Sequence, residues 1–144
     1  MKTSKQGIDF IKSFEKLRLQ AYLCEANKLT IGYGHTRGVR LGQTCTEAEA
    51  EQFLKEDLEI AEAEVNKVAN EVQLTQNQYD SLVSLCFNIG NENFKTSTLY
   101  RKVNADPNDP TIKGEFVRWI YCKKKKSKGL TRRRIEEAKI YFNN

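Results

Sequence analysis

The sequence lacks any apolar run long enough to cross a membrane, and it is poor in histidine and proline. It contains one histidine and two prolines, and no apolar run reaches the roughly 18 residues that a transmembrane helix needs. The four cysteines include no closely spaced Cys-x-x-Cys pair, which argues against a zinc site. We therefore expect a chain without a bound metal, a cofactor or a membrane-spanning helix.

The N-terminal segment also lacks the apolar core of a secretory signal peptide, because Asp9 and Lys12 interrupt the apolar residues that follow the basic start. We therefore expect a protein that is cytoplasmic at synthesis and acts after release. Reducing cytoplasm disfavours disulfides, so free thiols are expected at all four cysteines, Cys24, Cys45, Cys86 and Cys122.

Positive charge is in excess. The 144 residues are 39% hydrophobic and 30% charged, which is the profile of one globular domain with a sizeable core. The formal net charge is +5. An excess of positive charge favours anionic partners such as nucleic acid, acidic lipid or an anionic cell wall. The charge alone does not choose among them.

The N-terminal third combines a helix with short strands. Hydrophobic spacing predicts a helix from Thr3 to about Leu17, and Thr3 and Gln6 have the spacing of a capping box. Segments 18–23 and 29–34 are predicted as two strands joined by a turn at 24–28. Glycines then punctuate an irregular segment that extends to about residue 45.

Two helices with capping boxes follow. Thr46 and Glu49 predict the start of a long helix with one apolar stripe, formed by Leu54, Leu58, Ala61, Val65 and Val68. Thr75 and Gln78 predict the start of a second helix that is apolar on more than one side. We expect that helix to be central and buried, and to end near Gly90.

The C-terminal third is predicted to contain a turn, a helix, a basic loop and a last helix. Asp109 is expected to cap a helix whose first residue is Pro110 and whose buried face is formed by Phe116, Val117, Trp119 and Ile120. The basic segment 123–130 is expected to be a loop. Thr131 is then expected to cap the last helix, which carries the apolar residues Ile135, Ala138 and Phe142.

Together these elements predict an α+β fold with a small N-terminal β-lobe and a larger, mainly helical lobe. The β-lobe is expected at about 18–45, and the helical lobe at about 1–17 plus 70–144, linked by a helix at about 46–70. We expect residues 1–144 to form a single catalytic domain and a monomer. A cleft between the lobes is the expected place for a site.

Glu15 is a candidate catalytic acid at the end of the first predicted helix. Apolar neighbours such as Phe14 and Leu17 can raise the pKa of a carboxyl group, as a general acid requires. A solvated surface glutamate is the commoner alternative. Residues 30–36 (TIGYGHT) place two glycines where a ligand could approach closely, with the Thr30 hydroxyl able to position water.

The order of these motifs resembles the phage-type lysozymes, the endolysins of glycoside hydrolase family 24. The resemblance begins with residues 15–22 (EKLRLQAY), followed by 30–36. Residues 74–90 resemble the central helix of that family, and 94–99 (FKTSTL) resemble its next turn. Residues 129–134 (GLTRRR), with Glu137, resemble its C-terminal signature. The resemblance implies a lysozyme-like fold over nearly the whole chain.

The resemblance also implies a reaction, the hydrolysis of the β-1,4 bond between N-acetylmuramic acid and N-acetylglucosamine in peptidoglycan, after release to the cell wall. It implies Glu15 and Thr30 as catalytic residues, whereas Cys24 stands where the family usually has aspartate. Glycoside hydrolases generally use two carboxyl groups. Three interpretations follow: Cys24 acts as a thiolate, Glu25 takes the aspartate role, or no second group is needed.

Four further residues are expected at the substrate site: Tyr33, His35, Phe87 and Asn88. Tyr33 and His35 suit a bracing role on the strand better than a reactive one, and Phe87 and Asn88 could line the cleft from the helical lobe. The alternative to an active enzyme is a catalytically weak or inert peptidoglycan-binding relative.

Segment 123–134 holds a cluster of lysines and arginines. It is expected to attract an anionic wall or membrane surface, or to send one arginine into the cleft to pair with Glu15. Nucleic acid is not expected as a partner, because no recognition motif accompanies the charge.

Overall fold

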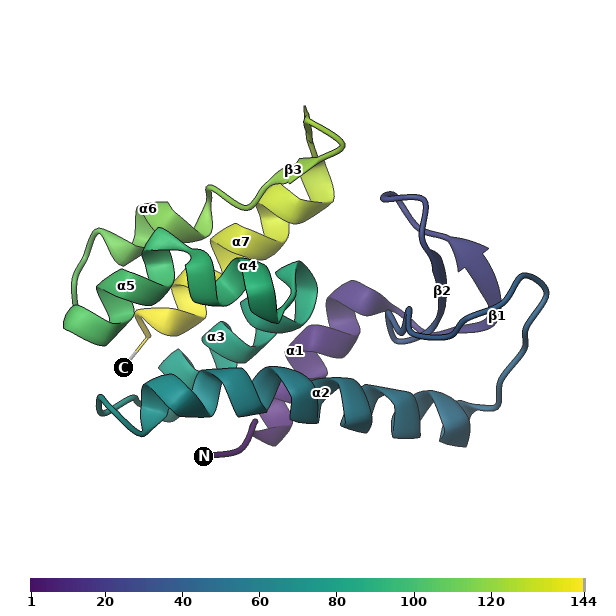
Figure 1. Ribbon diagram of the computed structural model, residues 1–144, viewed down its shortest axis with the longest axis horizontal. Helices are drawn as coiled ribbons and strands as arrows, with labels where there is room; N and C mark the ends of the chain where they lie inside the picture. The colour runs from purple at the N-terminus through teal and green to yellow at the C-terminus, as the bar shows by residue number, and fades with distance from the viewer. Residues whose placement is uncertain (144) are drawn as a thin grey trace.

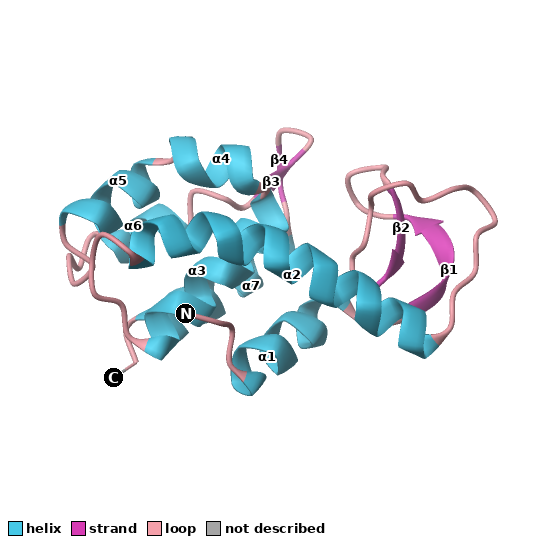
Figure 2. Ribbon diagram, turned by 60° about the horizontal axis from the view of Figure 1, so that its bottom comes forward, coloured by secondary structure: helices cyan, strands magenta, loops and turns pink. Residues whose placement is uncertain are grey.

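The computed structural model describes residues 1–143, and its elements confirm the predicted α+β class. In chain order they are α1 (Lys5–Glu15), β1 (Arg18–Leu23), β2 (Leu29–Gly32), α2 (Glu47–Ala69), α3 (Gln76–Ile89), α4 (Asn91–Thr96), α5 (Thr98–Ala105), α6 (Ile112–Phe116), β3 (Tyr121–Cys122), β4 (Lys125–Lys126) and α7 (Lys128–Tyr141). Figures 1 and 2 show β1 and β2 at one end, α3 to α7 at the other, and α2 running along both. Within residues 1–143, no helix combines the length and apolar character needed to cross a bilayer.

Helix α1 is capped by Ser4, so the predicted Thr3 cap is wrong. The Ser4 hydroxyl accepts a hydrogen bond from the Gly7 amide at 3.1 Å. Thr3 instead donates to Glu62 on α2 through both its amide and its hydroxyl, each at 2.7 Å. Thr3, which the spacing predicts as a local cap, is therefore bound instead to Glu62, an acceptor that is distant in the sequence.

The segment predicted as the β-lobe, residues 18–45, contains the antiparallel pair of β1 and β2, in which Tyr22 faces Thr30. Strand β1 has its predicted bounds, but β2 ends at Gly32 rather than at residue 34. The reason is a reversal of the chain: Gly32 and Gly34 have φ values of +65° and +76°. His35 then bonds back to Ile31 through amide and carbonyl, with both N···O distances 2.9 Å.

Helices α2 and α3 begin as predicted, each with a complete capping box, at Thr46/Glu49 and Thr75/Gln78. The whole predicted stripe of α2 is buried. Helix α3 is buried over most of its length and packs against α1, α2 and α7. It ends at Gly90, as predicted, where the backbone N–H donates to the Cys86 carbonyl. The central buried helix expected from its apolar faces is confirmed.

The start of α6 differs from the prediction. The helix begins at Ile112 rather than Pro110, because the Asp109 carboxylate accepts from the Thr111 amide at 2.8 Å and holds that segment in a turn. Phe116 and Ile120 are buried as predicted. Val117 is instead exposed, and Trp119 is only partly buried.

The predicted basic loop is wrong in its structure, because residues 121–126 form a β-hairpin and α7 begins at Lys128. Ser127, not Thr131, caps α7 by accepting from the Leu130 amide at 3.1 Å. Ile135 lies on the outer face of α7, where it is 43% exposed. Ala138 is buried, and Phe142 is partly buried.

Candidate active site

Glu15 is the last residue of α1, and its side chain lies where the two lobes meet. Lys16, with φ 48°, leaves the helix immediately after it. The Glu15 side chain is only 16% exposed. It contacts Gly34 of the β-lobe and Arg133 of α7, so one carboxylate touches segments that are distant in the sequence.

Gly34 leaves the space that this carboxylate occupies. A Cβ atom at position 34 would lie 2.9 Å from Cδ of Glu15, closer than carbon atoms pack. The φ value of +76° also belongs to the left-handed region that side chains disfavour. Glycine is therefore required here for both its conformation and its lack of a side chain.

Arg133 joins Glu15 to the core of the helical lobe. Its guanidinium donates to the Glu15 carboxylate, and its Nε donates to Glu137 at 3.2 Å. Its Nη2 lies 3.3 Å from both the carbonyl and the hydroxyl oxygen of Ser84. The Ser84 hydroxyl in turn donates to Glu137 at 2.5 Å. Arg133 is only 4% exposed, so this network fixes its position.

Arg134 completes a charge-balanced cluster. It pairs with Glu137 and donates to the Asn88 side chain and the Trp119 carbonyl. Two arginines thus face the carboxylates of Glu15 and Glu137. The prediction that an arginine of the last helix reaches Glu15 is confirmed, and the residue is Arg133. The apolar surroundings expected for Glu15 are absent on this side, because its neighbour is a guanidinium.

Cys24 lies in the turn between β1 and β2, and its thiol is partly exposed. Burial raises the pKa of the Cys24 thiol, but hydrogen bonds from the Lys28 backbone, the Thr30 hydroxyl and the turn backbone outweigh it and lower that pKa overall. A lowered thiol pKa increases the fraction of nucleophilic thiolate.

Thr30 lies beside this thiol on the returning strand. It is 3% exposed, and its hydroxyl donates to the Lys28 carbonyl at 2.9 Å. A hydroxyl has one proton to donate, so this hydroxyl can serve either the carbonyl or a thiolate at any moment. The structure thus brings Cys24 and Thr30 together, as predicted.

Tyr22 connects the two halves of the site, and sequence reasoning missed it. Partial burial raises the pKa of Tyr22, and the negative charge of Glu15 raises it further. Cys24 has the same effect to a smaller degree. One phenol therefore lies within electrostatic range of both candidate catalytic groups. Its position two residues before Cys24 on a pleated strand was the available signal.

Glu25 does not share the orientation of Cys24. Its carboxylate accepts a hydrogen bond from the Ser127 hydroxyl at 3.1 Å, across to the N-terminus of α7. Ser127 is 4% exposed. This contact engages Glu25 with the helical lobe, which tells against its use as the second catalytic carboxylate.

The four predicted substrate residues lie in two environments. Tyr33 and His35 are buried, with 9% and 7% of their surfaces exposed. His35 stacks on Phe53 with ring centroids 4.4 Å apart, and its Nδ1 lies 2.8 Å from Asp57. These contacts favour the bracing role. Phe87 and Asn88, at the end of α3, are partly exposed.

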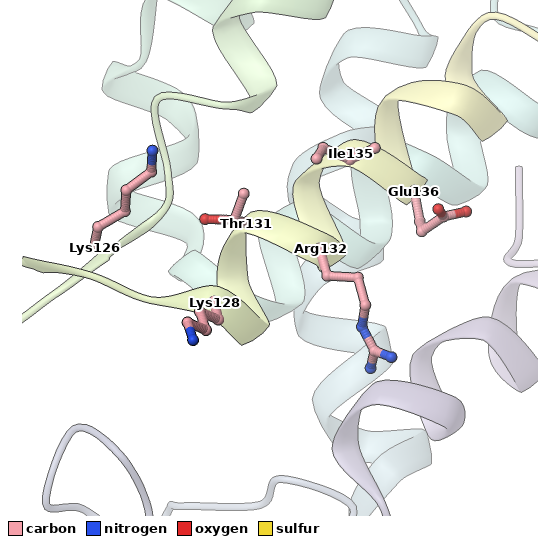
Figure 3. A pocket seen from close by; sticks show the side chains of 6 residues that line it. All are labelled: Lys126, Lys128, Thr131, Arg132, Ile135 and Glu136. Atoms are coloured by element: carbon pink, nitrogen blue, oxygen red, sulfur yellow. The ribbon is translucent and has the colours of Figure 1, made fainter.

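Two concavities lie elsewhere on the helical lobe. One, of about 580 Å³, follows the outer face of α7 and is lined by Lys126, Lys128, Thr131, Arg132, Ile135 and Glu136 (Figure 3). The other, of about 340 Å³, is lined by Thr96, Ser97, Thr98, Glu115, Arg118 and Trp119. Glu15, Cys24 and Thr30 line neither, so the candidate site is defined by contacts between the lobes.

Two of the network residues carried a weak signal in the sequence. Ser84 is a small polar residue on a helix that is otherwise largely apolar, and Glu137 is an acidic residue on the buried face of α7. Both are fully buried, with 0% of their surfaces exposed. Buried polar groups of this kind require partners, and here each partners Arg133.

The four cysteines are free, as predicted. Cys86 is buried in the core, and burial raises the pKa of its thiol to about 12. Burial also raises the pKa of the Cys45 thiol. Among Cys24, Cys45 and Cys86, the thiol pKa is lowered at Cys24 alone.

Comparison with known proteins identifies the family. Residues 12–137 match the family model described as phage lysozyme. The chain is 41% identical to the endolysin of Acyrthosiphon pisum secondary endosymbiont phage 1, with 98% of each chain covered. It is 38% identical to the endolysin of Salmonella phage P22, covering 96% of this chain and 97% of that one.

A solved structure agrees with these matches. The endolysin from Escherichia coli O157:H7 phage FAHEc1 superimposes with a TM-score of 0.86 at 40% identity, covering 99% of this chain and 94% of the other. The fold, the reaction class and the enzymatic nature expected from the sequence are thereby confirmed. The chain belongs to the phage lysozyme family, the glycoside hydrolases that cleave peptidoglycan.

Proposed function

We propose that this lysozyme cleaves the β-1,4 bond after N-acetylmuramic acid with Glu15 as the general acid and with Cys24 and Thr30 on the opposite side of the sugar. The observation that carries this proposal is the placement of Glu15. Its carboxylate ends α1 at the junction of the lobes, held between Gly34 and Arg133. Residues 1–144 act as a single catalytic domain in this proposal.

Arg133 has a defined part in the proton transfer. When protonated Glu15 gives its proton to the glycosidic oxygen, the bond from that oxygen to the anomeric carbon breaks and Glu15 becomes a carboxylate. The Arg133 guanidinium then faces a negative charge that did not exist before the transfer. An interaction that strengthens as charge develops lowers the barrier.

Cys24 and Thr30 act on the other face of the sugar. The partly exposed Cys24 thiol has a lowered pKa, so its thiolate can stabilise the positive charge that develops at the anomeric carbon or attack it directly. The Thr30 hydroxyl is close enough to donate to that thiolate or to orient the attacking water. Glu25 remains bound to Ser127 and takes no chemical part.

Substrate contacts come from the exposed end of α3. Phe87 and Asn88 are partly accessible beside the arginine network, and we assign them to the sugar chain. Tyr33 and His35 support the site from within the β-lobe, where Lys12 lies over the Tyr33 ring.

Replacement of Glu15 by glutamine tests the central role. An amide has no acidic proton to donate, so E15Q is expected to lose about 10²- to 10⁴-fold in the rate of peptidoglycan clearing. Thermal unfolding should show that the fold is kept, because Arg133 retains Glu137 and Ser84. Glu59→Gln, at an exposed position on α2, is the matched control and should keep full activity.

A folded E15Q variant with more than about a tenth of the parent rate would exclude general acid catalysis by this residue. An inert parent protein that still binds purified peptidoglycan would instead establish the weak or inert relative as the correct description.

A further inference from the structure

The hairpin of β3 and β4 places two lysines in an unusual backbone conformation. Tyr121 pairs with Lys126, and Cys122 pairs with Lys125. The two residues of the turn, Lys123 and Lys124, have φ values of +51° and +66°. Two-residue turns with both φ values positive are normally filled by asparagine and glycine. The conformational preferences of this turn therefore do not explain why lysine occupies either position. We attribute the two lysines to a role for their positive charge.

The cavity on the outer face of α7 continues from this hairpin. Lys126 belongs to the hairpin and also lines the cavity, next to Lys128. Figure 3 shows Ile135 on the exposed side of α7, with Arg132 extending toward the C-terminal part of α1. Two large apolar side chains border these cations: Ile135 is 43% exposed, and Tyr121 is 61% exposed.

Six exposed cations lie on the β3–β4 hairpin and the first half of α7, and we call this segment the lysine face: Lys123, Lys124, Lys125, Lys126, Lys128 and Arg132. Within residues 1–143 none of the six takes part in an ion pair. Elsewhere Lys5, Lys95 and Lys139 pair with acids on their own helices. In the sequence no acidic residue occurs between Glu115 and Glu136, and two acids lie at the edge of the segment: Glu25, bonded to Ser127, and Glu136, which lines the cavity. The lysine face is therefore complementary to a surface of dense negative charge.

The apolar neighbours indicate which anionic surface fits. Tyrosine and lysine together are typical of segments that lie at a lipid–water interface, where the ring sits among the headgroups and the lysine stems pack along it. Clusters of four to eight cations beside such residues bind anionic lipid. A sugar or a nucleobase can stack on the Tyr121 ring, but neither offers an apolar partner to the exposed aliphatic side chain of Ile135. A bilayer accommodates both, with the ring among the headgroups and the aliphatic side chain at the acyl boundary.

We propose that the lysine face, with Tyr121 and Ile135, docks the enzyme on a membrane whose phospholipids carry anionic headgroups. This function is separate from the catalytic roles of Glu15, Cys24 and Thr30, and it does not depend on them. It gives the enzyme a second surface that holds it at a bilayer.

Vesicle co-sedimentation with the full chain tests this proposal. The parent should bind vesicles of equal parts phosphatidylglycerol and phosphatidylcholine, and should not bind pure phosphatidylcholine. The double variant Lys124→Gln/Lys126→Gln should bind about twenty-five-fold more weakly, at about fivefold per lysine. Lys2→Gln/Lys55→Gln removes the same charge from other exposed positions and should weaken binding much less. Tyr121→Ser should weaken binding without changing the charge.

Four results would overturn the proposal. The first is a parent that ignores anionic vesicles, and the second is an equal loss of binding in both double variants, which would show an effect of net charge alone. The third is a Tyr121→Ser variant that binds anionic vesicles as well as the parent does, which would show that the tyrosine ring does not contribute to the interface. The fourth is a hairpin variant that keeps vesicle binding but loses binding to purified peptidoglycan or to duplex DNA. Circular dichroism of each variant checks that the fold is retained.

Discussion

The carboxylate of Glu15 accepts a hydrogen bond from Arg133, a residue 118 positions further along the chain. This single contact joins the end of α1 to the first half of α7. It brings the candidate acid into a cluster that includes the completely buried residues Ser84 and Glu137. The position of Glu15 therefore depends on the core of the helical lobe as well as on its own helix.

Gly34 and Gly38 provide a matched test of the space around Glu15. Both have positive φ values, +76° and +68°, but only at Gly34 would a side chain meet Glu15; at Gly38 nothing lies within 4 Å. Each change to alanine should destabilise the fold by about 1–2 kcal/mol. Only Gly34→Ala should also reduce lysis, by about 10²-fold if Glu15 moves by about 1 Å.

Denaturant unfolding and peptidoglycan clearing measure the two effects separately. Equal activity losses in the two glycine variants would show that backbone strain, and not contact with Glu15, limits the reaction.

Arg133 and Arg132 are adjacent in sequence but differ in environment. Arg133→Gln leaves Glu137 with only one cationic partner in the core, so it should reduce the free energy of unfolding by about 3–5 kcal/mol. Arg132 is exposed, and its guanidinium carbon lies 5.0 Å from the centroid of the Phe14 ring. Arg132→Gln should therefore cost at most about 1 kcal/mol. Urea titration of both variants distinguishes them, and similar costs would contradict the role of Arg133 in the buried network.

Arg133→Lys separates the stability role from the proton-transfer role. A lysine keeps the charge but cannot bridge Glu15, Glu137 and Ser84 together. We expect a folded variant with reduced kcat on a soluble peptidoglycan fragment and little change in KM. An unchanged kcat would mean that Arg133 stabilises the fold without assisting Glu15.

The Cys24 thiol should react faster than the thiols of Cys45 and Cys86. Hydrogen bonds lower the pKa of its thiol, whereas burial raises those of Cys45 and Cys86. The thiolate is the reacting form, so alkylation by iodoacetamide should accelerate as pH rises, with a midpoint below the usual value of about 8.5. Mass spectrometry should locate the first modification at Cys24, and a bound substrate fragment should slow it.

Substitutions then identify the second catalytic group. Cys24→Asp should keep or raise the rate of lysis, and Cys24→Ala should lower it. Glu25→Gln should be nearly silent, because the Glu25 carboxylate is bound to Ser127. The opposite ranking would assign the role to Glu25. Full activity in both Cys24→Ala and Glu25→Gln would leave the reaction to Glu15 and a water placed by Thr30.

Salt should weaken the action of the enzyme on walls. The chain carries a formal charge of +5, and its attraction to an anionic wall is screened as the Debye length falls from about 10 Å to about 3 Å. Clearing rates measured across that range should decrease steadily. Rates that do not change would show that charge has no part in the encounter.

Local features of the sequence were sufficient to predict several elements. The capping boxes at Thr46 and Thr75 and the bounds of β1 appear in the structure as predicted. The buried stripe of α2 does too. These features depend on residues within one or two turns of one another, so their energetics are encoded locally. The motif order that indicated a lysozyme is likewise a property of the sequence alone.

The tertiary structure decided the features that depend on distant partners. Thr3 lost its capping role to Ser4 because Glu62 engages it from α2. The basic segment forms a hairpin that is closed by the bond from the Ser127 amide to the Ile120 carbonyl at 2.8 Å, and the Ser127 hydroxyl also donates to the distant Glu25. The packing of α7 leaves Ile135 exposed.

The site follows the same division. The residue types of Glu15, Cys24 and Thr30 could be chosen from motifs, but three consecutive arginines are equivalent in the sequence. Only the rotation of α7 against α3 turns Arg133 toward Glu15 and leaves Arg132 in solvent. A helix rotates by about 100° per residue, so the choice among neighbouring side chains is made by packing and not by local pattern.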